Sequence, residues 1–156
     1  SGAMKEVQGF ASCTVPQRER IFADGRGPVT NDDSAVFNVK FENGTLASFV
    51  ASRLGVARHT IEVYGEGGMM LFRDDRPNEV EVWFKPLDGG YAGSPQVVQA
   101  PAEMVVEPWF NAETREFIDC VKTGRQPDRN FERALYIQQV LDAILESSQT
   151  GRAMEL

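Results

Sequence analysis

His59 is the residue whose type comes closest to acid–base chemistry, because it is the only histidine among the 156 residues. An imidazole works as a general base when a second group orients it, and the residues next to His59 in the sequence supply no such group. With no second histidine and no cysteine nearby, the sequence also argues against a zinc site. We therefore expect His59 to be an ordinary residue at the edge of a strand.

Two pairs of adjacent carboxylates, Asp32-Asp33 and Asp74-Asp75, are the next candidates for catalysis. Each pair stands beside a run that predicts a strand, where aspartate commonly hydrogen-bonds to the backbone of a turn. The two cysteines, Cys13 and Cys120, predict buried and reduced thiols in a cytosolic protein. These residues do not form a complete active site, and we expect no catalytic residue and no metal site in this chain.

The run Gly65-Glu66-Gly67-Gly68 follows a predicted strand, as the start of a dinucleotide-binding loop would. Such a loop needs a third glycine where Met70 stands here, and it must open a helix whose N-terminus binds the pyrophosphate. The residues after Gly68 form an apolar, strand-like run instead. We therefore predict a tight turn and no cofactor bound by this chain.

The charge balance limits the partners of the protein. A net charge of −7 argues against nucleic acids and anionic membranes, since phosphate binding needs a basic face. No apolar stretch approaches the ~20 residues of a membrane helix, and we expect a cytoplasmic protein. A small basic cluster of Arg18, Arg20 and Arg26 lies in a polar segment, where a solvated loop is favoured over an anion site.

Strand-like patterns come first in the chain and helix-like patterns come last. Alternating runs predict strands at residues 7–15, 35–41, 45–51, 59–64, 69–72, 79–84 and 96–99. A stripe of every third and fourth residue then predicts two helices. The first contains Phe110, Phe117 and Val121, and the second follows a cap at Asp128 or Asn130 and ends at Gly151. This order predicts an α+β fold, an open and mostly antiparallel sheet with two C-terminal helices packed on one face.

Residues 1–4 have the composition of a cloning remnant, and we leave them out of the fold. Residues 5–156 are expected to form a single domain.

The Asn43-Gly44 dipeptide joins two alternating runs and predicts a hairpin with a two-residue loop. In that register Phe41 lies opposite Leu46, and Phe49 lies on the second, mixed face of the sheet. Two helices cannot cover both faces of a sheet. We therefore expect the face with Phe49 to be an interface.

Four segments together resemble one known family. They are Asp32-Asp33-Ser34-Ala35 followed by Phe41-Glu42-Asn43-Gly44-Thr45, the run from Ile61 to Gly68, the run from Phe110 to Pro127, and the run from Ala134 to Arg152. In order and spacing they are similar to the C-terminal domain of the Gfo/Idh/MocA family. These are the NAD(P)-dependent oxidoreductases named for glucose–fructose oxidoreductase and inositol dehydrogenase, and the resemblance extends from about Lys5 to Leu156.

The resemblance implies that this chain is the cofactor-free part of a larger enzyme. An N-terminal Rossmann domain, absent here, would hold NAD or NADP, and the present domain would bind a small-molecule substrate such as a sugar or polyol. The resemblance also implies a homo-oligomer that forms through the open face of the sheet. The family's Glu-Lys-Pro motif has no counterpart, since Phe84-Lys85-Pro86 lacks the glutamate. Its Asp-x-x-x-His pair has none either, because Gly55 stands four residues before His59.

The segment from residue 16 to residue 33 is our best candidate for lining a substrate pocket, with Arg18 and Arg20 as contacts. Trp109 and Asn111, at the start of the first predicted helix, are further candidates. Two alternatives stay open. The chain could be a free-standing binding or scaffold module without enzymatic activity, or, with less support, a self-contained hydrolase.

Overall fold

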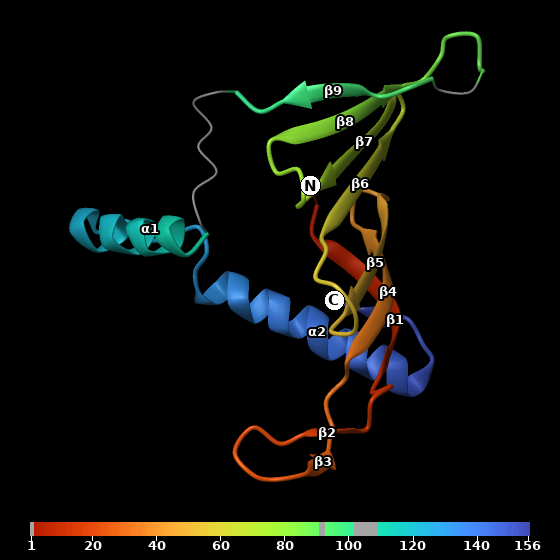
Figure 1. The fold of residues 1–156 in the computed structure, drawn as a ribbon. Coiled ribbons are helices and arrows are strands. Elements are labelled where there is room, and N and C mark those ends of the chain that lie inside the picture. Colours follow the sequence, from red (N-terminus) through yellow and green to blue (C-terminus); the bar gives the residue numbers. More distant parts are fainter. Residues whose placement is uncertain (1, 91–92, 102–108) are drawn as a thin grey trace. The chain divides into compact units, whose positions relative to one another are not determined.

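The computed structural model describes residues 2–90, 93–101 and 109–156, although the side chains of residues 109 and 110 lie outside the description. Strands precede helices, and all strand pairs are antiparallel (Figure 1). This confirms the α+β class. The elements are β1 Met4–Ser12, β2 Gln17–Glu19, β3 Arg26–Pro28, β4 Ser34–Phe41, β5 Leu46–Ser52, β6 Thr60–Gly65, β7 Gly68–Arg73, β8 Glu79–Phe84, β9 Gln96–Gln99, α1 Trp109–Thr123, α2 Phe131–Thr150 and β10 Met154–Glu155.

The chain divides into two compact units. The first comprises Ser1–Gly55 and Gln126–Leu156, and the second comprises Val56–Arg125. Each unit is described by itself, so the expectation of a single domain over residues 5–156 stays a prediction. The strands form three sheets, with the orders β10-β1-β4-β5 and β2-β3 in the first unit and β6-β7-β8-β9 in the second.

The first strand begins earlier than the sequence predicted. Met4 belongs to β1 and lies opposite Phe41, and the carbonyl of Ala3 accepts a hydrogen bond of 3.0 Å from the amide of Glu42. Leaving these two residues out of the fold was therefore wrong. The origin of residues 1–4 as a cloning remnant stays a prediction, and Ser1 lies outside the described residues.

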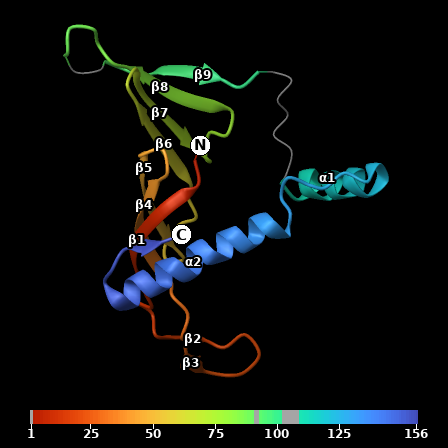
Figure 2. The ribbon, with the colours of Figure 1, turned by 180° about the vertical axis from the view of Figure 1, so that it is seen from behind.

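The core of the first unit lies between β1, β4 and α2, which crosses the sheet over β1 (Figure 2). Val7 and Val39 face each other across the two strands and are 0% and 2% exposed. They pack against Val140, Ala143 and Ile144 on α2. Burying an aliphatic side chain of this size contributes about 1.5–3 kcal/mol, so each buried member of this cluster stabilises the unit.

The two ends of α2 follow the predicted capping residues. The side chain of Asn130 accepts a hydrogen bond from the amide of Arg133, which satisfies one of the unpaired donors at the start of the helix. At the other end Gly151 has φ 69° and donates its amide to the carbonyl of Ser147. Glycine adopts this left-handed conformation without steric cost, so the helix ends there.

Two serines of α2 complete the outer edge of β1. The short strand β10 pairs with only Glu6 and Val7, so the amides farther along β1 need other partners. Ser147 Oγ accepts from the amide of Gly9 at 3.0 Å, and Ser148 Oγ accepts from the amide of Ala11 at 2.9 Å. The helix therefore supplies the hydrogen bonds that a neighbouring strand would otherwise make.

The hairpin between β4 and β5 has a different register from the predicted one. Phe41 donates its amide to Thr45, and Gly44, at φ 84°, donates its amide to Phe41, so the loop has three residues, 42–44. Phe37 consequently lies opposite Phe49, and their rings stack with centroids 4.8 Å apart. The predicted pairing of Phe41 with Leu46 was wrong by one residue.

This one-residue difference exchanges the two faces of β5, because side chains alternate along a strand. Phe49 shares the face of Phe37 and Val39, which α2 covers. It therefore does not lie on the open face, and its assignment to the predicted interface was wrong. The side chains of β5 on the opposite face are Leu46, Ser48, Val50 and Ser52.

The second unit contains a meander of four strands. Its first turn is the tight glycine turn that the sequence predicted, with Gly65 paired to Gly68. At Gly68 an added Cβ would lie 1.9 Å from the carbonyl oxygen of Trp83 on β8, so only glycine fits. No described helix is long and apolar enough to cross a membrane.

Candidate functional site

The segment predicted to line a pocket contains a small β-ribbon that the sequence did not reveal. Strands β2 and β3 pair Gln17 with Pro28 and Glu19 with Arg26. At the base of the ribbon the amide of Val29 donates a hydrogen bond to the carbonyl of Pro16. The strands carry no alternation of apolar and polar residues, which is the usual signal of a strand. The predicted loop is therefore an arm with its own hydrogen bonds.

Asp33 lies at the base of this ribbon and is 2% exposed. Its Oδ1 accepts hydrogen bonds from the amide of Thr14 at 3.0 Å and from the Thr14 hydroxyl at 2.7 Å. Its Oδ2 accepts from the amide of Val15 at 2.8 Å and from Arg18 Nη2 at 3.3 Å. An ionised carboxylate has about four acceptor positions, so four donors occupy its hydrogen-bonding capacity.

These donors stabilise the charged form of the carboxylate. The amide of Thr14 has the largest effect, and together with the Thr14 hydroxyl, the amide of Val15 and Arg18 it lowers the pKa of Asp33 to about 2, although burial acts in the opposite direction. A carboxylate with this pKa and no free acceptor position is a poor proton acceptor at neutral pH. Asp33, a member of the first carboxylate pair considered for catalysis, therefore has a structural role.

Arg18 and Arg20, the first two predicted substrate contacts, lie close together on the ribbon. Arg18 is half-buried beside Asp33, and its Nε is buried without a hydrogen-bond partner among the described residues. The side chain of Arg20 is exposed and covers Gly27, where an added Cβ would lie 2.8 Å from Arg20 Nε. Of the two, Arg20 has the guanidinium that a ligand could reach.

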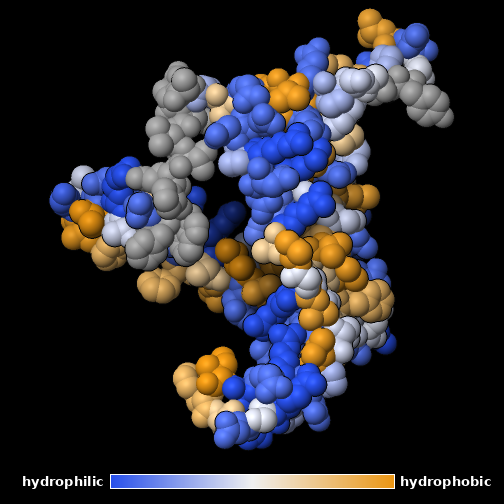
Figure 3. All heavy atoms as spheres, viewed as in Figure 1, coloured by the Kyte–Doolittle hydropathy of each residue, from blue (hydrophilic) through white to orange (hydrophobic). Residues whose placement is uncertain are grey.

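The far end of the ribbon carries two large apolar side chains in solvent. Ile21 is 87% exposed and Phe22 is 98% exposed, and Figure 3 shows hydrophobic residues at this end of the β2–β3 arm. The ribbon thus combines an exposed cation with an exposed apolar tip.

The other two predicted contacts belong to the second unit. Trp109 is the first residue of α1, and its side chain lies outside the described residues. Asn111, in the first turn of the same helix, is exposed. Since each unit is described by itself, Arg18 and Arg20 are the predicted contacts that the structure brings together. The substrate role of all four residues stays a prediction.

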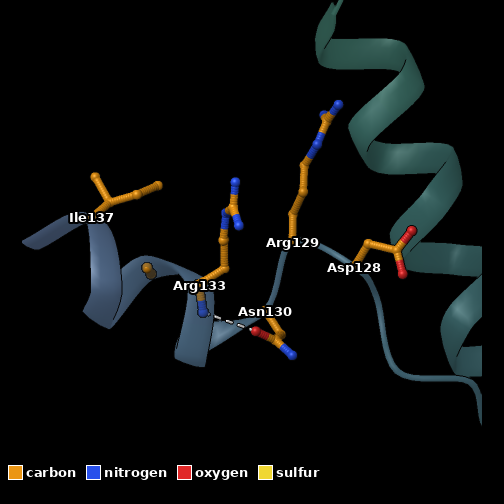
Figure 4. A pocket seen from close by; sticks show the side chains of 6 residues that line it. Asp128, Arg129, Asn130, Arg133 and Ile137 are labelled. Atoms are coloured by element: carbon orange, nitrogen blue, oxygen red, sulfur yellow. Dashed lines mark hydrogen bonds between the residues drawn. The ribbon is translucent and has the colours of Figure 1, made fainter. Parts of the chain in front are cut away.

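A cavity of about 540 Å³ lies at the start of α2 (Figure 4). Arg129 and Arg133 extend in the same direction beside it. Its lining comprises Asp128, Arg129, Asn130, Arg133, Ala134 and Ile137. Guanidinium groups donate hydrogen bonds to hydroxyl, carboxylate or phosphate oxygens but do not lose a proton in proteins, so this cavity suits binding rather than proton transfer. The sequence did not reveal it, because Arg129 precedes the N-cap Asn130 and helical spacing does not relate it to Arg133.

His59 has the orienting partner that the local sequence did not identify. Its Nδ1 lies 2.9 Å from Asp74 Oδ2, and its amide donates to the same oxygen. The hydrogen bond from the His59 side chain is the main cause of the lowered pKa of Asp74. The imidazole is 82% exposed, and no described hydroxyl or thiol is hydrogen-bonded to it, so the pair lacks the nucleophile of a hydrolase.

The described residues contain no group of three or more histidine, cysteine, aspartate or glutamate side chains that could hold a metal ion. Cys13 and Cys120 are free thiols, the first half-buried and the second buried.

Comparison with known proteins identifies the family. Residues 2–156 match the family described as the oxidoreductase family, C-terminal alpha/beta domain. The chain belongs to the Gfo/Idh/MocA family. A curated relative, levoglucosan dehydrogenase of Pseudarthrobacter phenanthrenivorans, is 25% identical over 139 residues, which cover 79% of this chain and 36% of that protein.

Solved structures of family proteins have the same fold. An oxidoreductase domain protein from Kribbella flavida has a TM-score of 0.78 at 25% identity, covering 97% of this chain and 46% of that chain. Levoglucosan dehydrogenase in complex with NADH and L-sorbose has a TM-score of 0.79 at 22% identity, covering 98% of this chain and 44% of the other. The chain thus spans less than half the length of these relatives.

Proposed function

We propose that this chain is the substrate-binding and oligomerisation domain of an NAD(P)-dependent oxidoreductase that acts on a sugar, a polyol or a similar hydroxylated compound. The observation that carries the proposal is the family match over residues 2–156. The curated relative is a dehydrogenase of levoglucosan. Because the chain covers 36% of that relative, we infer that an N-terminal Rossmann domain holds NAD or NADP in the full-length protein.

The division of chemistry between the two domains supports this proposal. In a nicotinamide enzyme the cofactor performs the hydride transfer, and protein groups bind and orient the substrate. The candidate contacts in the described part of this chain are hydrogen-bond donors. Arg20 on the ribbon and the pair Arg129 and Arg133 at the α2 cavity could all donate hydrogen bonds to hydroxyl oxygens of a sugar.

The uncovered face of the first unit's sheet supports the oligomerisation role. Its exposed apolar residues are Phe10, Val36, Leu46 and Val50, at 65%, 46%, 75% and 80% exposure. Phe10, Val36 and Val50 form one row across three strands, and a shallow cavity of about 280 Å³ lies beside them. Exposed apolar patches on a protein surface usually mark contacts. We assign the contact between copies to these residues, which we call the open face.

The proposal is tested by comparing the 156-residue chain with the natural full-length protein. We expect the full-length protein to bind NADH in calorimetry and to reduce NAD or NADP in the presence of one member of a panel of sugars, anhydrosugars and polyols, read at 340 nm. The 156-residue chain should give neither signal. Micromolar binding of NADH to the 156-residue chain would overturn the proposal.

The second candidate is a binding or scaffold module without enzymatic activity. It is favoured by one observation, that none of the described clusters combines a nucleophile with a base. The same experiment separates the two functions. A full-length protein that binds a sugar but neither binds NADH nor transfers hydride would favour the module.

A further inference from the structure

Asp33 joins the segments that meet at the base of the β2–β3 ribbon. Its amide donates to the carbonyl of Ser12 at 3.0 Å, at the end of β1, and its carbonyl accepts from the amide of Arg53 at 2.8 Å, just after β5. Its carboxylate binds Thr14 and Val15, which lead into the ribbon, and Arg18 on β2. A single buried residue thus bonds to the sheet through its backbone and to the start and the interior of the arm through its side chain.

The ribbon has few other means of holding its direction. Its strands pack mainly against each other, and the Arg26 side chain hydrogen-bonds within the ribbon, to the carbonyl of Gln17. In the described part of the chain, Arg18 makes the side-chain hydrogen bond that leads from the ribbon strands to the sheet. Cys13 adds only long contacts from its thiol to the carbonyls of Val15 and Val29, at 3.7 and 3.5 Å.

We propose that Asp33 is a positioning residue, which through Thr14, Val15 and Arg18 fixes the direction of the ribbon and thereby places Arg20 and the apolar tip. The carboxylate is buried and fully occupied, so it acts on a ligand only through the ribbon. The role in substrate binding rests on the proposed function above, whereas the anchoring of the ribbon does not.

The substitution Asp33→Asn separates this role from the bulk of the side chain. An amide has one acceptor oxygen and one donor nitrogen. In one orientation its NH₂ group faces the Val15 amide and Arg18, and in the other it faces the Thr14 amide and hydroxyl. Two donors therefore lose their acceptor in either orientation. Asp32→Asn is the matched control, since Asp32 is the adjacent aspartate and is exposed.

The first experiment measures hydrogen exchange in the 156-residue chain. Loss of a charge-assisted hydrogen bond should speed amide exchange in residues 14–30 about tenfold in Asp33→Asn and in Arg18→Gln. Exchange in β1 and β4 should stay within about twofold of wild type, because a local opening of the ribbon leaves the amides of the sheet protected. Arg18→Lys keeps the ion pair and should restore most of the protection, and Asp32→Asn should match wild type.

Two results would overturn the anchoring. The first is an equal increase in the ribbon and in β1 and β4, because Asp33 would then stabilise the whole sheet. The second is unchanged exchange in residues 14–30. Trypsin cleavage after Arg20 and Arg26 gives an independent reading and should be faster in Asp33→Asn than in Asp32→Asn.

The second experiment measures steady-state kinetics of the full-length protein with the sugar identified above. Asp33→Asn should raise KM about tenfold while kcat stays within about twofold, as expected when the loss is in substrate binding. A ribbon that loosens without any change in KM would overturn the positioning role and leave the oxidoreductase assignment intact. A full-length protein without hydride transfer would overturn the proposed function, while the exchange data still decide the anchoring.

Discussion

The two faces of the sheet in the first unit carry similar side chains in opposite surroundings. On one face Val7 and Val39 are almost fully buried beneath Val140, Ala143 and Ile144 of α2. On the other face Phe10, Val36, Leu46 and Val50 are 46% to 80% exposed. The difference lies in the elements that cover the strands rather than in residue type. Burial on one face is already satisfied within the chain, whereas the other face still has apolar surface to lose from water.

The largest expected effect comes from opening the covered face. Ile144→Ala removes a side chain that is 4% exposed and leaves a cavity against Val7 and Val39, which costs about 2–5 kcal/mol in the free energy of unfolding. Leu145→Ala is the matched control on the next residue of α2, which is 40% exposed, and should cost about half as much or less. Urea unfolding followed by circular dichroism measures both. Equal losses would mean that α2 does not cover this face as described.

A smaller loss is expected where α2 completes the edge of β1. Ser147 is fully buried, accepts from the Gly9 amide and donates to the Arg152 carbonyl at 2.6 Å. Ser147→Ala leaves both of those backbone groups without this partner and should lower the free energy of unfolding by about 1–3 kcal/mol. Exposed Ser48, on the open face, provides a control whose change to alanine should stay within about 0.5 kcal/mol. If Ser147→Ala left the free energy of unfolding unchanged, the hydrogen bonds that α2 supplies to this edge would not stabilise the fold.

Lowering the pH tests the polar junction at the end of the same sheet. The pKa of Asp33 is about 2 in the folded chain, against an ordinary value of 3.8, so the unfolded chain takes up this proton first as the pH falls. The stability that the ionised carboxylate contributes is complete above about pH 4 and is lost as the pH falls toward 2. Unfolding free energies measured from pH 5 to pH 2 should therefore decline less steeply in Asp33→Asn than in Asp32→Asn. Parallel declines would contradict this assignment.

The smallest effect on the fold is expected on the open face. Val50 is 80% exposed, so Val50→Asp should change the free energy of unfolding by no more than about 0.5 kcal/mol. If copies of the chain meet through this face, a buried charge should nevertheless abolish self-association in light scattering. Thr45→Asp adds the same charge just after the neighbouring loop and should leave association unchanged. Association that survives Val50→Asp would remove the open face as the contact.

Features with local causes could be predicted from the sequence. Asn130, Gly151 and the turn between Gly65 and Gly68 take the roles expected of them, because each depends on residues three or four positions away. The order of strands and helices follows from periodicity in the same way, and it sufficed to predict the α+β class.

Features that depend on distant partners could not be predicted. An Asn-Gly dipeptide is compatible with loops of two or three residues, and the hydrogen bond between Phe41 and Thr45 selects the longer loop. The donors around Asp33 come from residues 15 to 19 positions earlier in the chain. In the same way, Asp74 meets His59 only because β6 and β7 pair. Nothing in the neighbouring residues signals these contacts.

The three-residue turn at the end of β4 has a consequence for how this domain can vary among its relatives. Deleting or inserting a single codon there, with the pairing otherwise kept, would move Phe49 to the open face and Val50 to the face of Phe37 and Val39. Length changes at this point should therefore arise in twos, or be accompanied by a bulge. An alignment that places a lone gap between Phe41 and Leu46 would assign contact residues to the wrong side of the strand.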